Sequence, residues 1–249
     1  MIHYSYFNDF GSFEAFALPY FRERTFEGAD DRLSGGIIVT SDTALYESPS
    51  EQPELDLAAR YSNTIGNWGL GLSWFRGTSR ESDFFRFSDF TNGSTTVYYP
   101  QIDQLGVDVQ LTSGGWLFKL EAIHRNFDDH FYQDFVAATF GTEYTLVGIF
   151  HSIYDLGLLS EYSCDQRDQN ASSIFQNDAF IGARLSFNDI SDSQLLLGIF
   201  NDLNNTDSRA VFLEASRIAP LLTMNIELRY FDSSTPIDLL LGFKNDSFI

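Results

Sequence analysis

Hydrophobic and polar residues alternate with a period of two along most of the chain. In the segment LTMNIELRYF, which starts at Leu222, every second residue is apolar, while Asn225, Glu227 and Arg229 lie between them. Successive side chains of a strand point to opposite faces, so this pattern predicts a strand with one apolar and one polar face. Similar segments predict about twelve strands, at residues 2–7, 13–22, 54–65, 68–76, 101–112, 116–125, 135–150, 155–162, 181–187, 195–199, 211–215 and 222–231.

Short and long connections alternate between these strands. Gly66–Asn67 and Ser113–Gly115 predict tight turns, whereas the polar stretches 23–53 and 77–100 predict long loops. This rhythm, with one polar face, is typical of transmembrane barrels of bacterial outer membranes. We therefore predict an all-β fold. It would be an antiparallel up-and-down transmembrane β-barrel of about twelve strands plus a stub at 247–249, forming one domain over residues 1–249.

We expect this barrel to be incomplete. Short turns follow the odd-numbered strands, so the strand at Ile2 would run toward the periplasm, whereas a complete barrel starts with a strand that runs outward. The stub is shorter than the roughly 9–11 residues that span a membrane, although an ordinary frayed terminus is the alternative. The first residues also lack the basic and apolar regions of a signal peptide, so a leader was removed or the chain is a fragment. We expect strands to be missing before Ile2 and a closing strand after Ile249.

Composition narrows the function classes. The chain has no run of about 18 apolar residues, which excludes a transmembrane helix. Its net charge of -20 argues against nucleic-acid binding, because phosphate would be repelled. The same charge suits acidic outer loops that contact lipopolysaccharide through divalent cations, or loops that are simply soluble. The aromatic content of 16% would fit aromatic girdles at the membrane interfaces.

Charges of both signs fall on the predicted inward faces. Opposed acidic and basic rows would form a selectivity constriction, and the alternative is that they pair across neighbouring strands and only keep the interior polar. The lumen-lining candidates are Asp56, Arg60, Asp108, Lys119, Glu121, Arg125, Glu143, Glu161, Arg184, Glu214, Glu227 and Arg229.

Apolar residues also fall on the predicted inward faces, among them Ile123, Leu159, Phe180, Leu196 and Phe212. A wide water-filled channel would carry fewer of them. They predict either a path for amphipathic solutes or local filling around a loop that plugs the interior.

Signals for catalysis or metal binding are weak. Asp128–His130 resembles part of a hydrolase site, but adjacent acids do not by themselves supply a nucleophile and an oriented base, so a solvated charge cluster is the alternative. The segment 201–207 offers oxygen ligands for calcium, yet Asp207 stands where an EF-hand needs glycine, and an Asx-rich turn is the alternative. With Cys164 as the single cysteine and no phosphate-binding motif, we expect neither a cofactor nor an enzyme.

The whole chain resembles porin-like outer-membrane β-barrels of Gram-negative bacteria. More narrowly, FGSFEAFALPYFRER from Phe10 to Arg24, with the turn that begins at Asn8, and the closing KNDSFI resemble a poorly characterised group of proteobacterial outer-membrane proteins. Members of this group are encoded beside lipid-exporter-type pumps. The resemblance implies a location in the cell outer membrane and the export or passage of a hydrophobic or amphipathic solute. It also implies contact with outer-membrane lipid and lipopolysaccharide, and with an inner-membrane export pump.

A channel for small or amphipathic solutes is therefore the function that we expect. A structural or adhesive barrel with acidic loops is the first alternative, and an outer-membrane hydrolase is the second. At the level of fold, a soluble β-sandwich or lipocalin-like barrel competes, and it would bury the apolar face that the membrane prediction leaves exposed.

Overall fold

The computed structural model describes residues 1–26, 44–83, 86–87, 95–171, 173, 175–219 and 222–233, which fold as an all-β protein. Strands are favoured because alternation presents one apolar face per strand. The main sheet contains β1 (Ile2–Asn8), β2 (Gly11–Leu18), β4 (Asp56–Ile65), β5 (Trp68–Thr78), β7 (Gln101–Ser113), β8 (Trp116–Phe127), β9 (Phe135–Leu146), β10 (Asp155–Asp165), β11 (Asn177–Ser186), β12 (Gln194–Asp202), β13 (Arg209–Ala219) and β14 (Leu222–Asp232). In the described ranges, no helix is long and apolar enough to cross a membrane.

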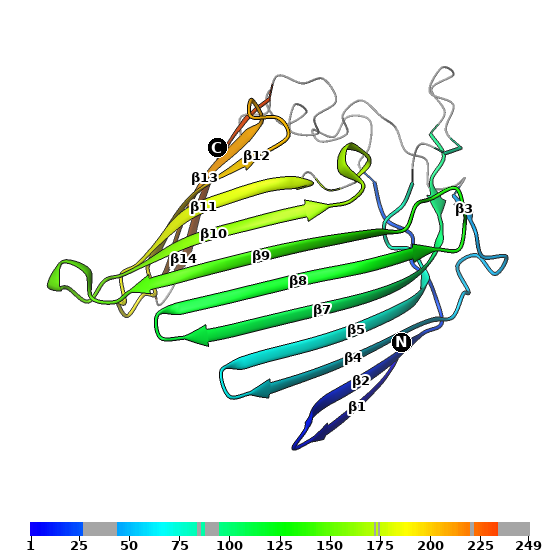
Figure 1. Ribbon diagram of the computed structural model, residues 1–249, viewed down its shortest axis with the longest axis horizontal. Helices are drawn as coiled ribbons and strands as arrows, with labels where there is room; N and C mark the ends of the chain where they lie inside the picture. The colour runs from blue at the N-terminus through cyan, green and yellow to red at the C-terminus, as the bar shows by residue number, and fades with distance from the viewer. Residues whose placement is uncertain are drawn as a thin grey trace. The chain divides into compact units, whose positions relative to one another are not determined.

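Each strand of the main sheet pairs with the strand that follows it in the chain, apart from the two short strands β3 (Leu45–Tyr46) and β6 (Tyr98–Tyr99). The order from β1 to β14 can be followed in Figure 1. The pairing is antiparallel, which confirms the predicted up-and-down order of twelve strands. β1 and β14 stand at the two ends of this order, and closure of the sheet into a barrel stays a prediction.

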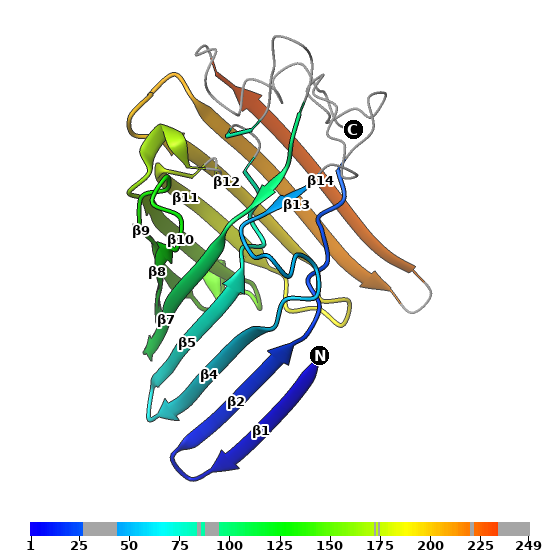
Figure 2. The ribbon, with the colours of Figure 1, turned by 90° about the vertical axis from the view of Figure 1, so that its right-hand side faces the viewer.

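Tight turns lie where the sequence predicts them. The hairpin of β1 and β2, coloured blue in Figure 2, pairs Asn8 with Gly11. Gly66 and Gly114 adopt φ values of 58° and 59° in the two-residue turns that follow β4 and β7. Such turns need positive φ, which glycine adopts without a steric penalty.

Two predicted strands were too long, and two short strands were not predicted. The strand predicted for 135–150 ends at Leu146, because a 3₁₀ turn at Ile149–His151 places Phe150 and His151 at positive φ. The strand predicted for 13–22 ends at Leu18, since Pro19 has no N–H to donate to a neighbouring strand. The long loops contain β3 and β6, which pair in parallel and were not predicted. The predicted stub at 247–249 lies outside the described residues.

The register from β9 to β14 separates two faces. Across these six strands, one row is apolar throughout: Tyr144, Leu158, Ala183, Leu197, Leu213 and Leu228. Leu158, Leu197 and Leu228 are each about half exposed, at 46%, 52% and 45%. The described residues of the chain therefore do not cover this face.

Alternation along β5, β7 and β14 predicts that nine apolar residues point outward, and their burial agrees with this prediction. Leu72, Leu105, Met224, Ile226 and Leu228 are exposed. Leu70, Trp74, Val107 and Val109 are half-buried, and none of the nine is fully buried. A soluble fold with this face in a closed interior would give the opposite result.

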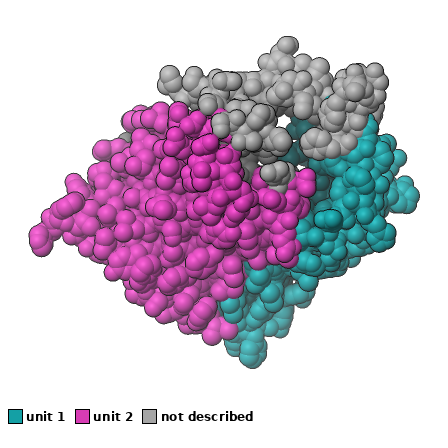
Figure 3. Space-filling model, turned by 45° about the horizontal axis from the view of Figure 1, so that its top comes forward, with its two compact units in different colours: residues 1–64, 70–107, 123–135 teal, residues 65–69, 108–122, 136–249 magenta. Residues whose placement is uncertain are grey.

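The chain divides into two compact units, shown in Figure 3. Unit 1 comprises residues 1–64, 70–107 and 123–135, and unit 2 comprises residues 65–69, 108–122 and 136–249. In unit 1 the most tightly packed core lies in the loops, where Phe21, Val97 and Tyr99 are at most 1% exposed. Arg80 lies over the Phe21 ring, with 4.6 Å between Cζ and the ring centroid. The described residues at the ends of the long loops of unit 1 thus form a packed body.

Candidate functional site

The polar face of unit 2 carries most of the side chains that could bind a ligand. Its central row runs from Glu143 on β9 to Arg229 on β14, through Leu159, Gly182, Gly198 and Phe212. The adjacent row contains Arg184, Leu196, Glu214 and Glu227. Charged, apolar and glycine positions therefore share one face, as the alternation predicts.

Glu143 and Arg184 form an ion pair that crosses β10. The strand between them carries Gly157, which pairs with Thr145 on one side and with Arg184 on the other. A Cβ atom at Gly157 would lie 2.7 Å from Oε1 of Glu143. The missing side chain at position 157 is thus what leaves room for the pair. Sequence alternation placed both charges on this face, but it did not identify them as partners.

A second charged group lies beside this pair. Glu161 on β10 is half-buried, and it interacts electrostatically with Glu121 and Lys119 on β8, which are exposed. A small pocket of about 70 Å³ opens between these strands. Its lining consists of Leu117, Lys119, Gly141, Thr142, Glu143, Leu159, Ser160, Glu161 and Phe180. Because Gly141 has no side chain, the space beside Glu161 stays open.

Phenylalanine rings continue the polar face from this pocket. Phe180 stacks on Phe212 with 5.5 Å between ring centroids, and its centroid lies 4.7 Å from that of Phe200. Phe175, from the loop before β11, packs on Phe200 at 4.6 Å. We call Phe175, Phe180, Phe200 and Phe212 the phenylalanine cluster. Phe180 is only 8% exposed, so the cluster is a packed feature of the face.

Two glycines make room for these rings. A Cβ atom at Gly182 would come within 2.5 Å of Phe180 Cζ. At Gly198 it would come within 2.3 Å of Phe180 Cε2 and 2.8 Å of Phe212 Cζ. The rings therefore lie directly over the backbone of β11 and β12. Phe175 and Phe200 were not among the predicted residues, although Phe200 shares its parity with Leu196 and could have been found from alternation.

Near the edge strand β14, Glu227 and Arg229 form an ion pair of 2.8 Å along the same strand. Both side chains are more than half exposed. Glu214 lies directly opposite Glu227 in the register, so two carboxylates face each other across β13 and β14. Such like-charge neighbours repel each other and favour a nearby cation.

In unit 1, predicted lumen residues are held by hydrogen bonds and ion pairs to other parts of the chain. Asp56 is fully buried, accepts a hydrogen bond of 2.9 Å from the Thr78 N–H and binds Arg80 at 2.6 Å. It therefore anchors the start of the second long loop and does not line an open surface, which corrects the prediction for this residue. Arg60 lies opposite Glu14 in the register of β2 and β4.

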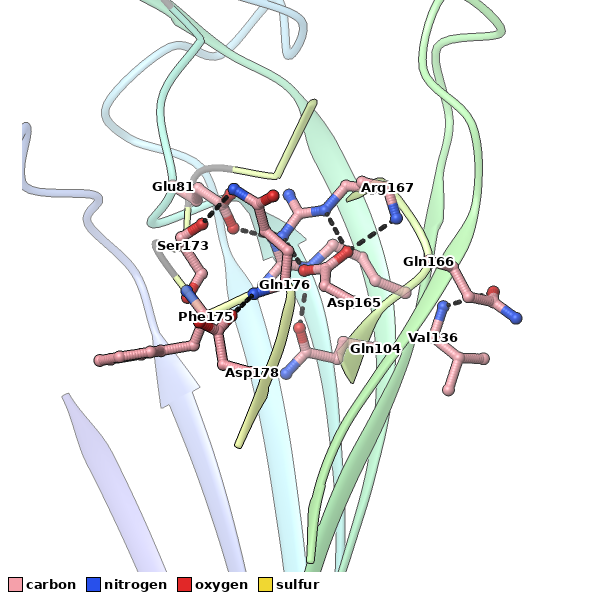
Figure 4. Close-up of polar contacts among 11 residues, drawn as sticks. Glu81, Gln104, Val136, Asp165, Gln166, Arg167, Ser173, Phe175, Gln176 and Asp178 are labelled. Atoms are coloured by element: carbon pink, nitrogen blue, oxygen red, sulfur yellow. Dashed lines mark hydrogen bonds and ion pairs between the residues drawn. The ribbon is translucent and has the colours of Figure 1, made fainter. Parts of the chain in front are cut away.

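Arg125 connects the polar face of unit 1 to the loop that follows β5. Its Nε donates to Gln104 Oε1 at 2.8 Å, and its Nη1 binds Glu81 at 2.6 Å. Figure 4 shows Gln104 and Glu81 in these contacts. The loop therefore reaches the polar face of β7 and β8, which favours the predicted alternative of local filling by a loop in this unit. Asp108, which lies in unit 2, is half-buried on β7.

The suspected hydrolase cluster is held in ion pairs. Asp128 binds Arg76 at 2.5 Å, and Asp129 binds Arg86. Arg86 also lies 4.6 Å from the ring centroid of Phe131. The hydrogen bond from Arg86 holds the pKa of Asp129 below its ordinary value. Arginine partners of this kind hold the two carboxylates in place, which is a structural role.

Tyrosines surround the same arginine. Burial raises the pKa of Tyr98 to about 12, and burial also raises the pKa of Tyr132, which donates a hydrogen bond of 2.5 Å to Asp83. Both phenols therefore stay neutral at physiological pH and act as hydrogen-bond donors.

The loop suspected of binding calcium is an Asx turn. Asp202 Oδ1 accepts hydrogen bonds from the backbone N–H groups of Asn204 at 2.7 Å and Asn205 at 3.0 Å. This is the alternative that the sequence left open. In the part of the chain that the structure describes, no three His, Cys, Asp or Glu side chains come together in a group that could hold a metal ion.

The loop before β11 is held by side chains in a similar way. Arg167 Nη2 binds Asp165 Oδ2 at 2.7 Å, and the N–H of Gln176 donates to Asp178 Oδ2 at 2.7 Å, as drawn in Figure 4. These contacts fix both ends of the segment that carries Phe175. The phenylalanine cluster thus has a loop side chain held over it.

No protein-family profile matches the chain, and neither the curated proteins nor the solved structures contain a match.

Proposed function

We propose that this protein forms a transmembrane β-barrel in the outer membrane of a Gram-negative bacterium and passes small or amphipathic solutes through a polar lumen of mixed charge. The observation that carries the proposal is the exposed apolar face of unit 2, where Leu158, Leu197 and Leu228 are about half exposed while charges gather on the other face. Large contiguous apolar surfaces of this kind need a cover, and lipid is the cover that a barrel uses.

The lengths of the connections support the same proposal. Gly66–Asn67 and Gly114–Gly115 join strands in two residues, whereas the connections that follow β2 and β5, at the other end of the strands, are long and polar. Barrels of outer membranes have short periplasmic turns and longer extracellular loops. In this orientation, the loop body around Phe21, Val97 and Tyr99 faces the outside of the cell, where lipopolysaccharide is its neighbour.

Export of an amphipathic solute, in partnership with an inner-membrane pump, is the finer form of the proposal. The phenylalanine cluster on the polar face supports it, because a channel for ions alone has no use for an apolar surface of Phe180, Phe200 and Phe212. The exposed ion pair of Glu227 and Arg229 supports a solvated passage beside it.

A structural or adhesive barrel is the second candidate. The observation that favours it is the packing of the long loops, in which Asp56, Phe21 and Tyr99 are almost fully buried. Packed residues at the ends of the strands suit a surface that contacts a partner.

Conductance separates the two candidates. The purified protein is refolded in detergent, its folding is checked by circular dichroism and heat-modifiable electrophoretic mobility, and it is inserted into planar lipid bilayers. We expect discrete conductance steps, with heat-denatured protein as the control. Folded, inserted protein without conductance would contradict the channel and leave the structural candidate. Failure to insert would contradict the membrane assignment itself.

A further inference from the structure

The pocket beside Glu161 has the size of a small polar head group. Its volume of about 70 Å³ accommodates only a few heavy atoms, and it is open toward the polar face of unit 2. The floor is formed where Gly141 lies opposite Glu161 in the register of β9 and β10. A ligand that used this pocket would place a compact group in it and leave the rest of its body on the neighbouring surface.

The charges at this pocket favour a cation. Glu143 is neutralised by its ion pair with Arg184. The other charged residues of the lining are Lys119 and Glu161, one positive and one negative. Glu121 does not line the pocket but interacts electrostatically with Glu161, and with it the group of three has a net negative charge. The chain as a whole carries a net charge of -20. Both the local and the overall field therefore attract cations and repel anions.

An apolar surface begins where the pocket ends. Phe180 lines the pocket and is also the central ring of the phenylalanine cluster, in contact with Phe200 and Phe212. Leu159 lies between Glu143 and Gly182 in the same row. Aromatic faces bind apolar groups and also attract ammonium groups. A charged head group and an apolar body would thus find complementary surfaces side by side.

We infer that the polar face of unit 2 is a binding site for amphipathic organic cations, which place an ammonium group in the pocket beside Glu161, where Phe180 lines the wall, and an apolar body on Phe200 and Phe212. The inference rests on the proposed function, because it names the class of solute that passes along this face. Binding itself can be measured without conductance, so the two can fail separately.

The test uses a matched pair of probes with the same apolar body and opposite charge. Phenylbutylammonium and phenylbutyrate are titrated by isothermal titration calorimetry into the refolded protein in lipid nanodiscs, with empty nanodiscs as the blank. We expect saturable binding of the ammonium compound and at least about tenfold weaker binding of the carboxylate, because the carboxylate would face Glu161 and Glu121. Equal binding of the two probes, or no binding of either, would overturn the inference.

Three variants locate the site. Glu161→Gln keeps the size of the side chain and should weaken binding of phenylbutylammonium about tenfold, since a hydrogen bond to a charged group is lost. Phe180→Leu keeps an apolar side chain and should weaken binding of phenylbutylammonium about threefold through loss of the aromatic face. Asp207→Asn removes one negative charge from the exposed loop between β12 and β13 and should bind as the unchanged protein does.

Conductance of the same preparations separates the two proposals. Selective binding in a protein that does not conduct would contradict the channel and leave the binding site. Conductance without selective binding, or equal effects of Glu161→Gln and Asp207→Asn, would contradict the binding site and leave the channel. Because the control also lacks one charge, a purely long-range effect of net charge would be recognised.

Discussion

Carboxylates on the same sheet differ in what their partners allow them to do. Asp56 is fully buried between a backbone N–H and Arg80, so it stabilises a loop. Glu143 is neutralised across a neighbouring strand by Arg184. Glu161 lies beside a pocket, with both a positive and a negative side chain near it. The surroundings of each residue, more than its type, separate structural anions from candidate ligand-binding ones.

Asp129→Asn tests the loop cluster around Arg86. The pKa of Asp129 is lowered by Arg86, so its stabilising effect is present at neutral pH and is lost as the pH falls below the ordinary value of 3.8 and through the lowered value. Both side chains of the pair are less than a quarter exposed. We expect the variant to lose about 1–2 kcal/mol of local stability at pH 7, with the difference shrinking toward zero in acid.

Hydrogen exchange at the Phe131 amide reports this change, because that N–H donates to Asp129 Oδ1 at 3.0 Å. Burial raises the pKa of Glu47 nearby, which favours the fold in acid, but Glu47 is present in both proteins and largely cancels in the comparison. A difference that stays constant from pH 7 to pH 3 would contradict the assignment to the ion pair.

Gly198→Ala tests how tightly the phenylalanine cluster lies on the sheet. An added Cβ would lie 2.3 Å from Phe180 Cε2 and 2.8 Å from Phe212 Cζ, so the rings must shift. Overpacking of this kind costs about 1–3 kcal/mol, and we expect a loss in that range from denaturant unfolding. Gly69→Ala is the matched control, because its Cβ would meet only Gln110 Cβ at an ordinary 3.7 Å. Equal stability of the two variants would show that the rings are not held in place.

At the scale of the element, each strand is amphipathic and each hairpin is determined by its turn. Two-residue turns with Gly66 and Gly114 at positive φ set the register of their hairpins. The connection between β9 and β10 is wider, because Gly148, Phe150 and His151 all adopt positive φ in a short 3₁₀ turn. Alternation is preserved on both sides of this turn, so the two faces continue from strand to strand.

Neighbouring positions on β14 test which face meets lipid. Ile226 and Asn225 are both exposed in the protein alone, so packing within the chain does not distinguish them. Ile226→Arg should lower the free energy of unfolding in lipid vesicles by about 2–4 kcal/mol if the position lies near the bilayer midplane. Asn225→Arg should have little effect, because its side chain faces the polar side. Equal losses would remove the basis for a lipid-facing side.

At the scale of the whole molecule, the loops and the sheet differ in how they pack their apolar residues. Among the described residues, the tightest packing surrounds Phe21, Val97 and Tyr99 in the loops of unit 1, and none of them covers the apolar face of the sheet. In unit 2 the polar face combines ion pairs with the phenylalanine cluster. A protein that folds in water would bury the apolar face of its sheet first, so this distribution favours lipid as the surrounding medium.

Charge reversal on the polar face tests conduction by the whole protein. Arg229→Glu should shift selectivity toward cations and Glu227→Lys toward anions, because the two side chains form an exposed pair on that face. The reversal potential in a salt gradient measures the change, and folding should remain nearly intact because the lipid face is untouched. Leu228→Glu, between them in the chain, should instead impair insertion. Unchanged selectivity in normally folded protein would favour the structural candidate.

Alternation and turn residues determined the order of the strands and the face on which each residue lies, because both depend on local geometry with a period of two. Residues such as Glu143, Arg184 and Phe180 could therefore be placed on the polar face from sequence alone. The short strands at Leu45 and Tyr98 could not, since their pairing joins distant parts of the chain. The boundary near Phe150 could not either, because it depends on positive φ values in a turn that alternation does not encode.

Partners, in contrast, were decided by the tertiary structure. Glu143 meets Arg184 only because the register brings Gly157 between them, and Arg125 meets Glu81 only because a loop returns to the sheet. Alternation places Asp56 on the same face as Arg60, yet Asp56 is buried and bound at the end of its strand. The pocket beside Glu161 likewise needs Gly141 opposite it on the next strand. A one-dimensional pattern specifies the face of each residue, whereas register and loop packing specify its neighbours, and neighbours decide its chemistry.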